Sequence, residues 1–245
     1  MKSQTRIVMG MPATLQVPES TSSVLVDAIF DYFEEIDQIY SPYIVTSEVS
    51  QLRRNELKFA DISPEFSEII RLAQTAKQKT DGYFDISHNG VLDPSGIVKG
   101  WAIDRASKML SAAEIEDYLV EIAGDMYCAG KYAQDTSWKI GIRAPFEPSK
   151  VVKELMISNA AIATSGTTER GQHIYSPFSD LPIEDIISIS VIGPDVLWAD
   201  IFATAAFAMG KTGIDWIESM PGYEGFLVLP DMTGIATSRF EKYIA

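Results

Sequence analysis

The sequence predicts an α+β domain. Helical periodicity dominates the first half of the chain and short strand patterns dominate the second half, which argues against a repeated βαβ arrangement. No linker composition or internal repeat divides residues 1–245, so we expect a single domain. Hydrophobic residues make up 46% and charged residues 22% of the chain, which is enough for a sizeable buried core.

The first half of the chain is predicted to hold one strand and three helices. Residues 6–17 alternate loosely between apolar and small or polar side chains, as strands do. Residues 22–40 place their apolar positions at helical spacing, namely Val26, Ile29, Phe30, Phe33, Ile36 and Tyr40. A second helix is expected over 47–55, and a third from Ser63, which has the character of an N-cap, to about Gly82.

The second half opens with a turn-rich piece, 87–96, and a helix over about 97–110. Five strands are then expected, at 118–123, 138–143, 154–158, 161–165 and 187–192. Residues 196–209 are typical of a buried helix, a shorter helix is expected at 213–219, and a hairpin near 226–237 closes the chain.

The charge balance argues against nucleic acid as a partner. The 34 Asp and Glu residues outnumber the 20 Lys and Arg residues, and the resulting net charge of −14 repels phosphate backbones. The longest basic run is Arg53-Arg54. An anionic ligand would therefore need local neutralisation by a metal ion or a helix N-terminus. The one cysteine, Cys128, allows neither an internal disulfide nor a multi-thiolate metal site.

No part of the sequence predicts membrane insertion. Residues 1–13 lack the long apolar stretch of a signal peptide, and Pro12 interrupts them. No other stretch is long and apolar enough to cross a bilayer. If the sequence is the whole gene product, we expect it to stay in the cytoplasm.

The first group of residues that could carry chemistry is the turn and helix start at 92–101. Free N–H groups at a helix start, with glycines beside them, favour an anion. Lys99 lies in the first turn, where the helix dipole disfavours a cation, and a phosphate or a carboxylate could offset that cost. The alternative, which the residues alone favour, is a capped helix start in which Gly100 permits close packing.

The second group lies at 163–177, where a strand is expected to run into a polar turn and return. This path would bring Ser165, Arg170 and His173 near one another. A histidine facing a cleft is the natural proton acceptor near neutral pH, and the chain has only His88 and His173. The residues alone support equally a catalytic base and a hydrogen-bonded hairpin histidine.

The third group is the pair Asp200 and Thr204, which are four residues apart and so share one face of the apolar helix. A buried carboxylate is costly unless it is paired or binds a metal. Carboxylate and hydroxyl oxygens suit Mg²⁺, which leaves coordination positions for water and substrate phosphate. Alternatively, Asp200 caps the helix or accepts a buried hydrogen bond; the apolar context favours the metal.

Five runs of sequence together resemble the FAD:protein FMN transferases, the ApbE-type flavin transferases. They are DPSGIVKGWAID, GIRAP, AIATSG, ADIFATAAFAMG and GYEGFLVL, and they occur in the family's order over nearly the whole chain. The resemblance implies an α+β fold related to the tunnelling fold, with a mixed sheet and packed helices. It also implies transfer of the FMN half of FAD, with Mg²⁺, onto a Thr or Ser hydroxyl in a motif of an acceptor flavoprotein, releasing AMP. Hydrolysis of FAD, or flavin binding without catalysis, are the alternatives.

The resemblance also assigns roles to particular residues. The magnesium ligands would be Asp200, Thr204 and the carbonyl of Gly96. The catalytic residues would be His173, which would help to deprotonate the acceptor, and Asp200. The residues expected to contact FAD are Met9, Tyr43, Tyr83, Phe84, Asp85, Asp93, Lys99 and Tyr175. Two departures from the family pattern concern the flavin site: Ser176 stands where the family has Asp, and the stretch between FDIS and DPSG is short. The family's Gly-Gly-Asp motif is Ala123-Gly124-Asp125 here.

Overall fold

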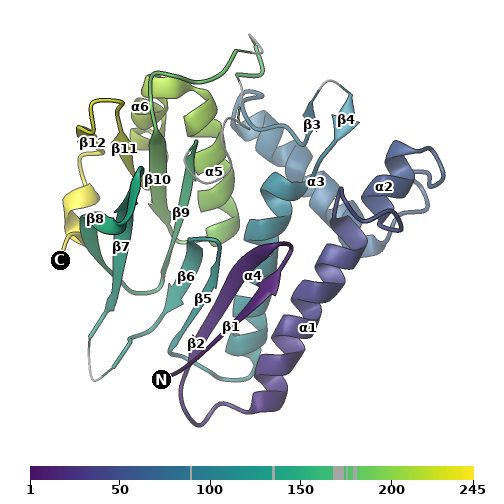
Figure 1. The fold of residues 1–245 in the computed structure, drawn as a ribbon, viewed down its shortest axis with the longest axis horizontal. Coiled ribbons are helices and arrows are strands. Elements are labelled where there is room, and N and C mark those ends of the chain that lie inside the picture. The colour runs from purple at the N-terminus through teal and green to yellow at the C-terminus, as the bar shows by residue number, and fades with distance from the viewer. Residues whose placement is uncertain (89, 134–135, 168–173, 175, 179–180) are drawn as a thin grey trace.

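The computed structural model describes residues 1–245 except 89, 134–135, 168–173, 175 and 179–180. Its centre is an eight-stranded sheet in the order β1-β2-β5-β6-β9-β10-β11-β12 (Figure 1). The strands are β1 (Lys2–Val8), β2 (Met11–Val17), β5 (Tyr118–Ile122), β6 (Asp125–Ala129), β9 (Ala160–Gly166), β10 (Ser188–Gly193), β11 (Glu224–Val228) and β12 (Gly234–Ala236). All neighbouring strands are antiparallel. The expectation of a sheet with both parallel and antiparallel strands was therefore wrong.

Two tight turns explain where the predicted strands were wrong. The range 6–17 is not one strand but the hairpin of β1 and β2, because Met9 and Gly10 both adopt positive φ, at 50° and 70°. This is the backbone of a type I′ turn, whose twist matches that of the two strands. Ala123 and Gly124 form a second turn of the same kind, with φ of 51° and 90°. That turn starts β6, which the sequence pattern did not predict.

Six α-helices are described, and each predicted helix is present to within a few residues at its ends. They are α1 (Ser23–Tyr40), α2 (Glu48–Arg53), α3 (Pro64–Lys79), α4 (Ser95–Ala112), α5 (Val196–Ala208) and α6 (Gly213–Glu218). Side-chain oxygens of Ser22, Ser47, Ser63 and Asp195 cap the starts of α1, α2, α3 and α5. Two short 3-10 helices, η1 (Gly210–Thr212) and η2 (Phe240–Tyr243), follow α5 and β12.

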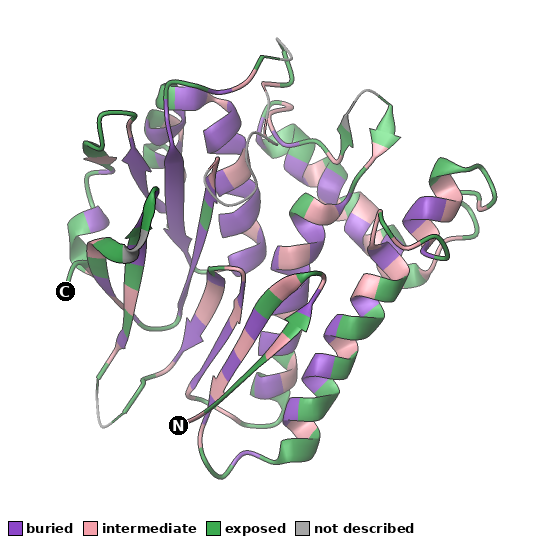
Figure 2. Ribbon diagram, in the orientation of Figure 1, coloured by how far each residue is buried: buried purple, intermediate pink, exposed green. Residues whose placement is uncertain are grey.

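The helices cover one face of the sheet and a second hairpin covers the other. In β5, Tyr118 and Val120 join the core beneath α1, α4 and α5, whereas Leu119 points to the opposite face, as the two-residue period of a strand requires. The opposite face is covered by β7 (Trp138–Ala144), β8 (Glu147–Ile157) and η2. Figure 2 shows α5 as almost wholly buried between its neighbours, which fits the apolar sequence of this helix.

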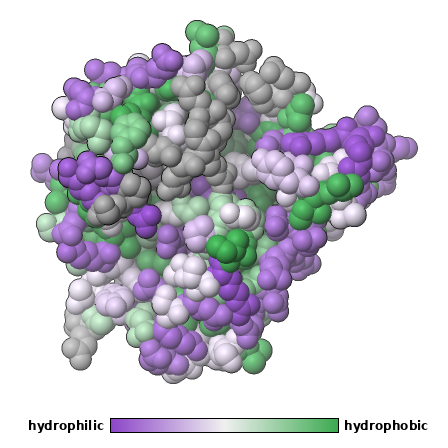
Figure 3. All heavy atoms as spheres, viewed as in Figure 1, coloured by the Kyte–Doolittle hydropathy of each residue, from purple (hydrophilic) through white to green (hydrophobic). Residues whose placement is uncertain are grey.

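The end of the molecule that carries α2 projects from this body. The small hairpin of β3 (Ser87–His88) and β4 (Val91–Leu92) lies near it, between α3 and the start of α4 (Figure 1). The surface of the projecting end is mostly hydrophilic, with a few apolar residues among the polar ones (Figure 3). In the described part of the chain no helix is both long and apolar enough to span a membrane.

Candidate functional site

One end of the central sheet brings together residues that are far apart in the sequence. Ala13 pairs with Ile122 in the ladder between β2 and β5. The turn that holds Met9 and the turn that precedes Asp125 therefore lie side by side at this end. Strand β9 also ends here, because the Thr164 N–H donates to Oδ1 of Asp125 over 2.9 Å.

Asp125 and Lys99 form a buried ion pair at this end of the sheet. Asp125 is only 1% exposed, and its Oδ2 atom contacts the Nζ atom of Lys99, the fifth residue of α4. The same ammonium lies 3.5 Å from Oδ1 of Asp200 on α5. Two carboxylates thus neutralise the Lys99 ammonium, and a carboxylate is one of the two partners that the sequence suggests for it, the other being a phosphate.

Asp200 does not cap its helix. The cap of α5 is Asp195, whose side chain accepts from the Trp198 N–H over 2.9 Å. Asp200 is 3% exposed, and its Oδ2 atom has no hydrogen-bond partner among the described residues. Burial, with a smaller contribution from Asp125, raises the pKa of Asp200 to about 7, although Lys99 acts in the opposite direction. A buried carboxylate oxygen of this kind calls for a cation or a proton.

Thr204 lies one turn beyond Asp200 on the same face of α5, and its Oγ1 atom is 3.2 Å from Oγ of Ser165. Helix α4 crosses α5 closely at Gly100, where an added Cβ would lie 3.3 Å from Oδ2 of Asp200. Gly96 lies about one turn nearer the start of α4 than Gly100. One turn of α4 thus separates Gly96 from Gly100, the residue that packs against Asp200.

Asp200, Thr204 and the Gly96 carbonyl offer oxygen atoms, the type of donor that a hard divalent cation takes. No group of three or more His, Cys, Asp or Glu side chains that could hold a metal occurs among the described residues. Mg²⁺ does not need one, since it is commonly held by one or two carboxylates together with water and phosphate oxygens. The unpartnered Oδ2 of Asp200 is the observation that favours such an ion.

Arg53, the last residue of α2, contacts the segments that carry Tyr43 and Asp93, both of which are expected to contact FAD. The Arg53 Nε donates to the Leu92 carbonyl over 2.7 Å, and its Nη1 donates to the Pro42 carbonyl over 3.2 Å. Its Nη2 lies 3.7 Å from Oδ2 of Asp93. The Tyr43 side chain itself is 87% exposed.

The three predicted residues at 83–85 lie in different surroundings. Tyr83 lines a cavity of about 350 Å³ together with Ser176 and residues at the end of α5. Phe84 is buried, and its ring lies 3.5 Å from where a Cβ of Gly96 would be. Asp85 accepts from Lys77 over 2.6 Å at the surface. Of the three, Tyr83 is the one that lines this cavity.

His173 and Tyr175 lie outside the described residues, as does Arg170, so their predicted roles stay predictions. Nothing is described of the His88 side chain.

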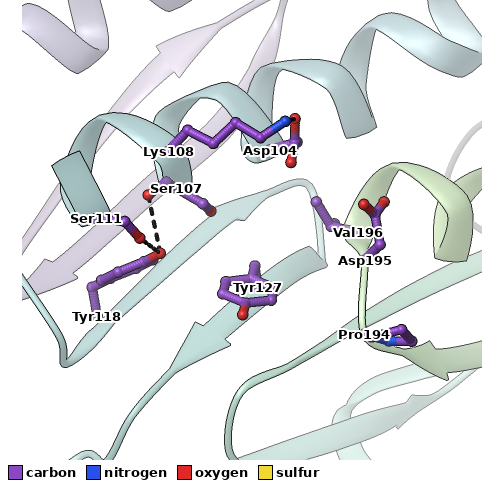
Figure 4. Close-up of a pocket in the computed structure, with 9 residues that line it drawn as sticks. All are labelled: Asp104, Ser107, Lys108, Ser111, Tyr118, Tyr127, Pro194, Asp195 and Val196. Carbon is purple, nitrogen blue, oxygen red and sulfur yellow. Dashed lines mark hydrogen bonds and ion pairs between the residues drawn. The ribbon is translucent and has the colours of Figure 1, made fainter. Parts of the chain in front are cut away.

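A smaller cavity, of about 160 Å³, lies along the C-terminal half of α4 and the start of α5 (Figure 4). Lys108 pairs with Asp104 there over 2.6 Å, and the Tyr118 hydroxyl lies 2.9 Å from Oγ of Ser111. None of the residues predicted from the sequence lines it. The third charged side chain of its lining, Asp195, caps α5, and the cavity is separate from the site around Lys99.

Sequence reasoning missed two residues of this site, Asp125 and Arg53. Asp125 was noted only as part of Ala123-Gly124-Asp125, although an aspartate directly after a strand and a glycine turn could have marked a buried anion. Arg53 was noted only for its charge. No local signal shows that its guanidinium reaches Leu92, because that contact depends on how α2 packs against β4.

Comparison with known proteins identifies the family to which this chain belongs. A family model described as the ApbE family matches residues 9–91 and 87–227. The FAD:protein FMN transferase of Treponema pallidum is 30% identical over 162 residues, which cover 57% of this chain and 44% of that protein. That of Vibrio cholerae is 32% identical, over 49% of this chain and 39% of the relative. These two matches span less than half of each relative's length. The FAD:protein FMN transferase of Chlamydia muridarum is 25% identical, over 86% of this chain and 83% of that protein.

Solved structures show the same fold. The crystal structure of the ApbE protein from Thermotoga maritima superposes with a TM-score of 0.87 at 22% identity, over 100% of this chain and 99% of that one. The flavin transferase ApbE from Vibrio cholerae superposes with a TM-score of 0.84 at 21% identity, over 99% of each chain. The predicted α+β fold is thereby confirmed.

Proposed function

The chain belongs to the ApbE family, and we propose that it transfers the FMN half of FAD to a Thr or Ser hydroxyl of an acceptor flavoprotein, with release of AMP. The observation that carries the proposal is that Asp200 is buried and its Oδ2 lacks a hydrogen-bond partner among the described residues. Asp200 lies four positions before Thr204 in the sequence, and its Oδ1 lies beside Lys99. Relatives of the chain are named FAD:protein FMN transferases, which supports this reaction.

Asp200, Thr204 and the Gly96 carbonyl are the proposed ligands of Mg²⁺. When bound, the ion supplies positive charge against the pyrophosphate of FAD. Asp200 provides a charge-bearing ligand from a helix that packing holds rigid. The hydroxyl of Thr204 is kept near its place by Ser165.

The proposed contacts of FAD are the residues expected from the resemblance, which are Met9, Tyr43, Tyr83, Phe84, Asp85, Asp93, Lys99 and Tyr175. Lys99 is a suitable partner for phosphate oxygens, because it is positively charged and its side chain, although paired with carboxylates, is 19% exposed. The exposed ring of Tyr43 can stack on a flat ligand. The buried ring of Phe84 supports the start of α4.

In the proposed reaction the acceptor hydroxyl oxygen attacks the phosphorus of the FMN half. A phosphoester bond forms to the acceptor, the bond between the two phosphates breaks, and AMP leaves with its electron pair. We assign to His173 the removal of the hydroxyl proton, since a hydroxyl is a weak nucleophile until a base accepts that proton. Lys99 can hold the phosphate oxygens while negative charge shifts towards AMP.

The test is to incubate the protein with FAD, Mg²⁺ and a peptide carrying a Thr-Gly-Ala-Thr-like sequence. Flavin fluorescence that remains on the peptide after denaturing gel electrophoresis is expected, and a chelator should abolish it. Free FMN and AMP without labelled peptide would indicate FAD hydrolysis instead. Bound, unconverted FAD would indicate a flavin-binding protein without catalysis.

A further inference from the structure

Arg53 joins two segments that are distant in the sequence. Its guanidinium donates to the Pro42 carbonyl on one side and to the Leu92 carbonyl on the other, and it faces the carboxylate of Asp93. The first segment continues directly into the exposed Tyr43. The planar guanidinium has donors in several fixed directions, so it can hold such a set of acceptors in one arrangement.

The contacts of Asp93 extend this connection to the helix that carries the site. The Oδ1 atom of Asp93 accepts from the Ser95 N–H over 3.0 Å, at the first residue of α4. Its Oδ2 atom faces Arg53. One carboxylate therefore links Arg53 to the start of the helix that presents Gly96 and Lys99.

We propose that Arg53 is a positioning residue for FAD. Arg53 fixes Tyr43 and Asp93 at a constant separation across one side of the binding site. The inference rests on the proposed function, because both residues are assigned to FAD there. Without Arg53, the loop around Pro42 and the loop around Leu92 lose a shared hydrogen-bonding partner. FAD would then have to order both loops as it binds, and part of its binding free energy would be lost.

Arg54 provides a matched control. It is adjacent in the sequence and makes contacts of similar number and kind, to the Val45 carbonyl over 2.9 Å and to both oxygens of Glu56. It contacts neither Pro42 nor Asp93. Replacing Arg54 therefore removes the same charge from the same end of α2 while leaving the connection between the two loops in place.

The experiment compares Arg53→Ala, Arg53→Lys and Arg54→Ala with the wild-type protein. Backbone hydrogen exchange without FAD should speed up at both 42–44 and 92–95 in Arg53→Ala, and at neither segment in Arg54→Ala. The dissociation constant for FAD should rise by roughly tenfold to a hundredfold in Arg53→Ala. The dissociation constant of Arg53→Lys should lie between those of the wild type and Arg53→Ala, because an ammonium can face Asp93 but cannot hold both carbonyls. If Arg53→Ala is too unstable to purify, Arg53→Gln should show the same selective changes.

Each result bears on a different part of the inference. Unchanged exchange at both segments would overturn the connection itself, whether or not FAD binds. Faster exchange with wild-type FAD affinity would overturn the role in positioning FAD. Failure of the wild-type protein to bind FAD, with the exchange pattern as expected, would instead overturn the proposed function on which that role rests.

Discussion

The ammonium of Lys99 lies 3.5 Å from Oδ1 of Asp200 while it contacts Oδ2 of Asp125. One positive charge is thus shared by two buried carboxylates, so the cluster keeps a net negative charge if both are ionised. A buried cluster of this charge is costly alone and attracts a cation. This arrangement supports the proposal of a cation site, in which Lys99 would supply one positive charge and the metal ion the rest.

Replacing Asp200 by Asn should abolish Mg²⁺-dependent conversion of FAD and leave the fold intact. The amide keeps the size of the side chain but removes the charge that the metal requires. Calorimetric Mg²⁺ titration and FAD turnover measure the effect. Asp195→Asn is the control, because asparagine also caps a helix and this position lies outside the site. Wild-type Mg²⁺ dependence in the Asp200 variant would show that the metal assignment is wrong.

The stability of the metal-free protein should depend on pH through Asp200. Its pKa rises from 3.8 in the unfolded chain to about 7 in the fold, mainly through burial. The folded state therefore binds this proton more tightly, so stability from this group is present at low pH and is lost as the pH rises through about 7. As the pH rises from 3.8 to about 7, the melting temperature of the wild type should therefore fall relative to that of Asp200→Asn. A constant difference between the two proteins would contradict the shift.

Stabilisation by Mg²⁺ should change with pH in the opposite direction. The metal binds the ionised carboxylate, so its binding below about pH 7 must first release the proton from Asp200. The rise in melting temperature at a fixed Mg²⁺ concentration should therefore be larger at pH 8 than at pH 6, values on either side of that pKa. An equal rise at both values would argue against Asp200 as the ligand that titrates.

Gly100→Ala should weaken Mg²⁺ binding more than it changes stability. Alanine in place of glycine ordinarily stabilises a helix interior by about 1 kcal/mol. Here the new Cβ would lie 3.0 Å from Cα of Leu197 and 3.3 Å from Oδ2 of Asp200, so α5 must shift at the metal site. Mg²⁺ titration and thermal melting separate the two effects. An unchanged Mg²⁺ affinity in Gly100→Ala would show that α5 accommodates the new Cβ without displacing Asp200.

His173→Ala should slow transfer of FMN by on the order of a hundredfold or more, with FAD binding nearly intact. The physical reason is that the acceptor hydroxyl would lose the base that takes its proton. His88→Ala is the control, since these are the only two histidines of the chain. A dependence on His88 in place of His173 would reverse the assignment. Normal transfer by both variants would point to a carboxylate such as Asp180 or to metal-bound hydroxide.

Helical periodicity made the helices predictable, whereas the turns of the sheet were harder. All six apolar positions chosen for the helix at 22–40 are buried in α1, because a helix on a sheet must bury one continuous stripe. The turns at Met9-Gly10 and Ala123-Gly124 lack the Asn or Asp that marks type I′ hairpins. Their positive φ angles were therefore not visible in the sequence, and β6 was overlooked.

For the candidate site, too, contacts within one helix could be predicted from the sequence, whereas contacts between distant segments could not. The spacing of Asp200 and Thr204 is local, and the sequence was enough to predict that both lie on one face of α5. The partner of Lys99 is not local, since Asp125 reaches it only after β6 has paired within the sheet. The connection through Arg53 likewise requires the packing of α2 beside β4.

The most direct test of the proposed transfer is its stoichiometry. The protein is incubated with FAD, Mg²⁺ and the Thr-containing peptide, and the peptide adduct and AMP are quantified together by mass spectrometry and chromatography. Transfer to the hydroxyl predicts one AMP for each peptide that gains FMN, no adduct on a peptide with Val in place of Thr, and neither product with the Asp200→Asn variant. AMP released together with free FMN, at the same rate with and without the peptide, would contradict the account.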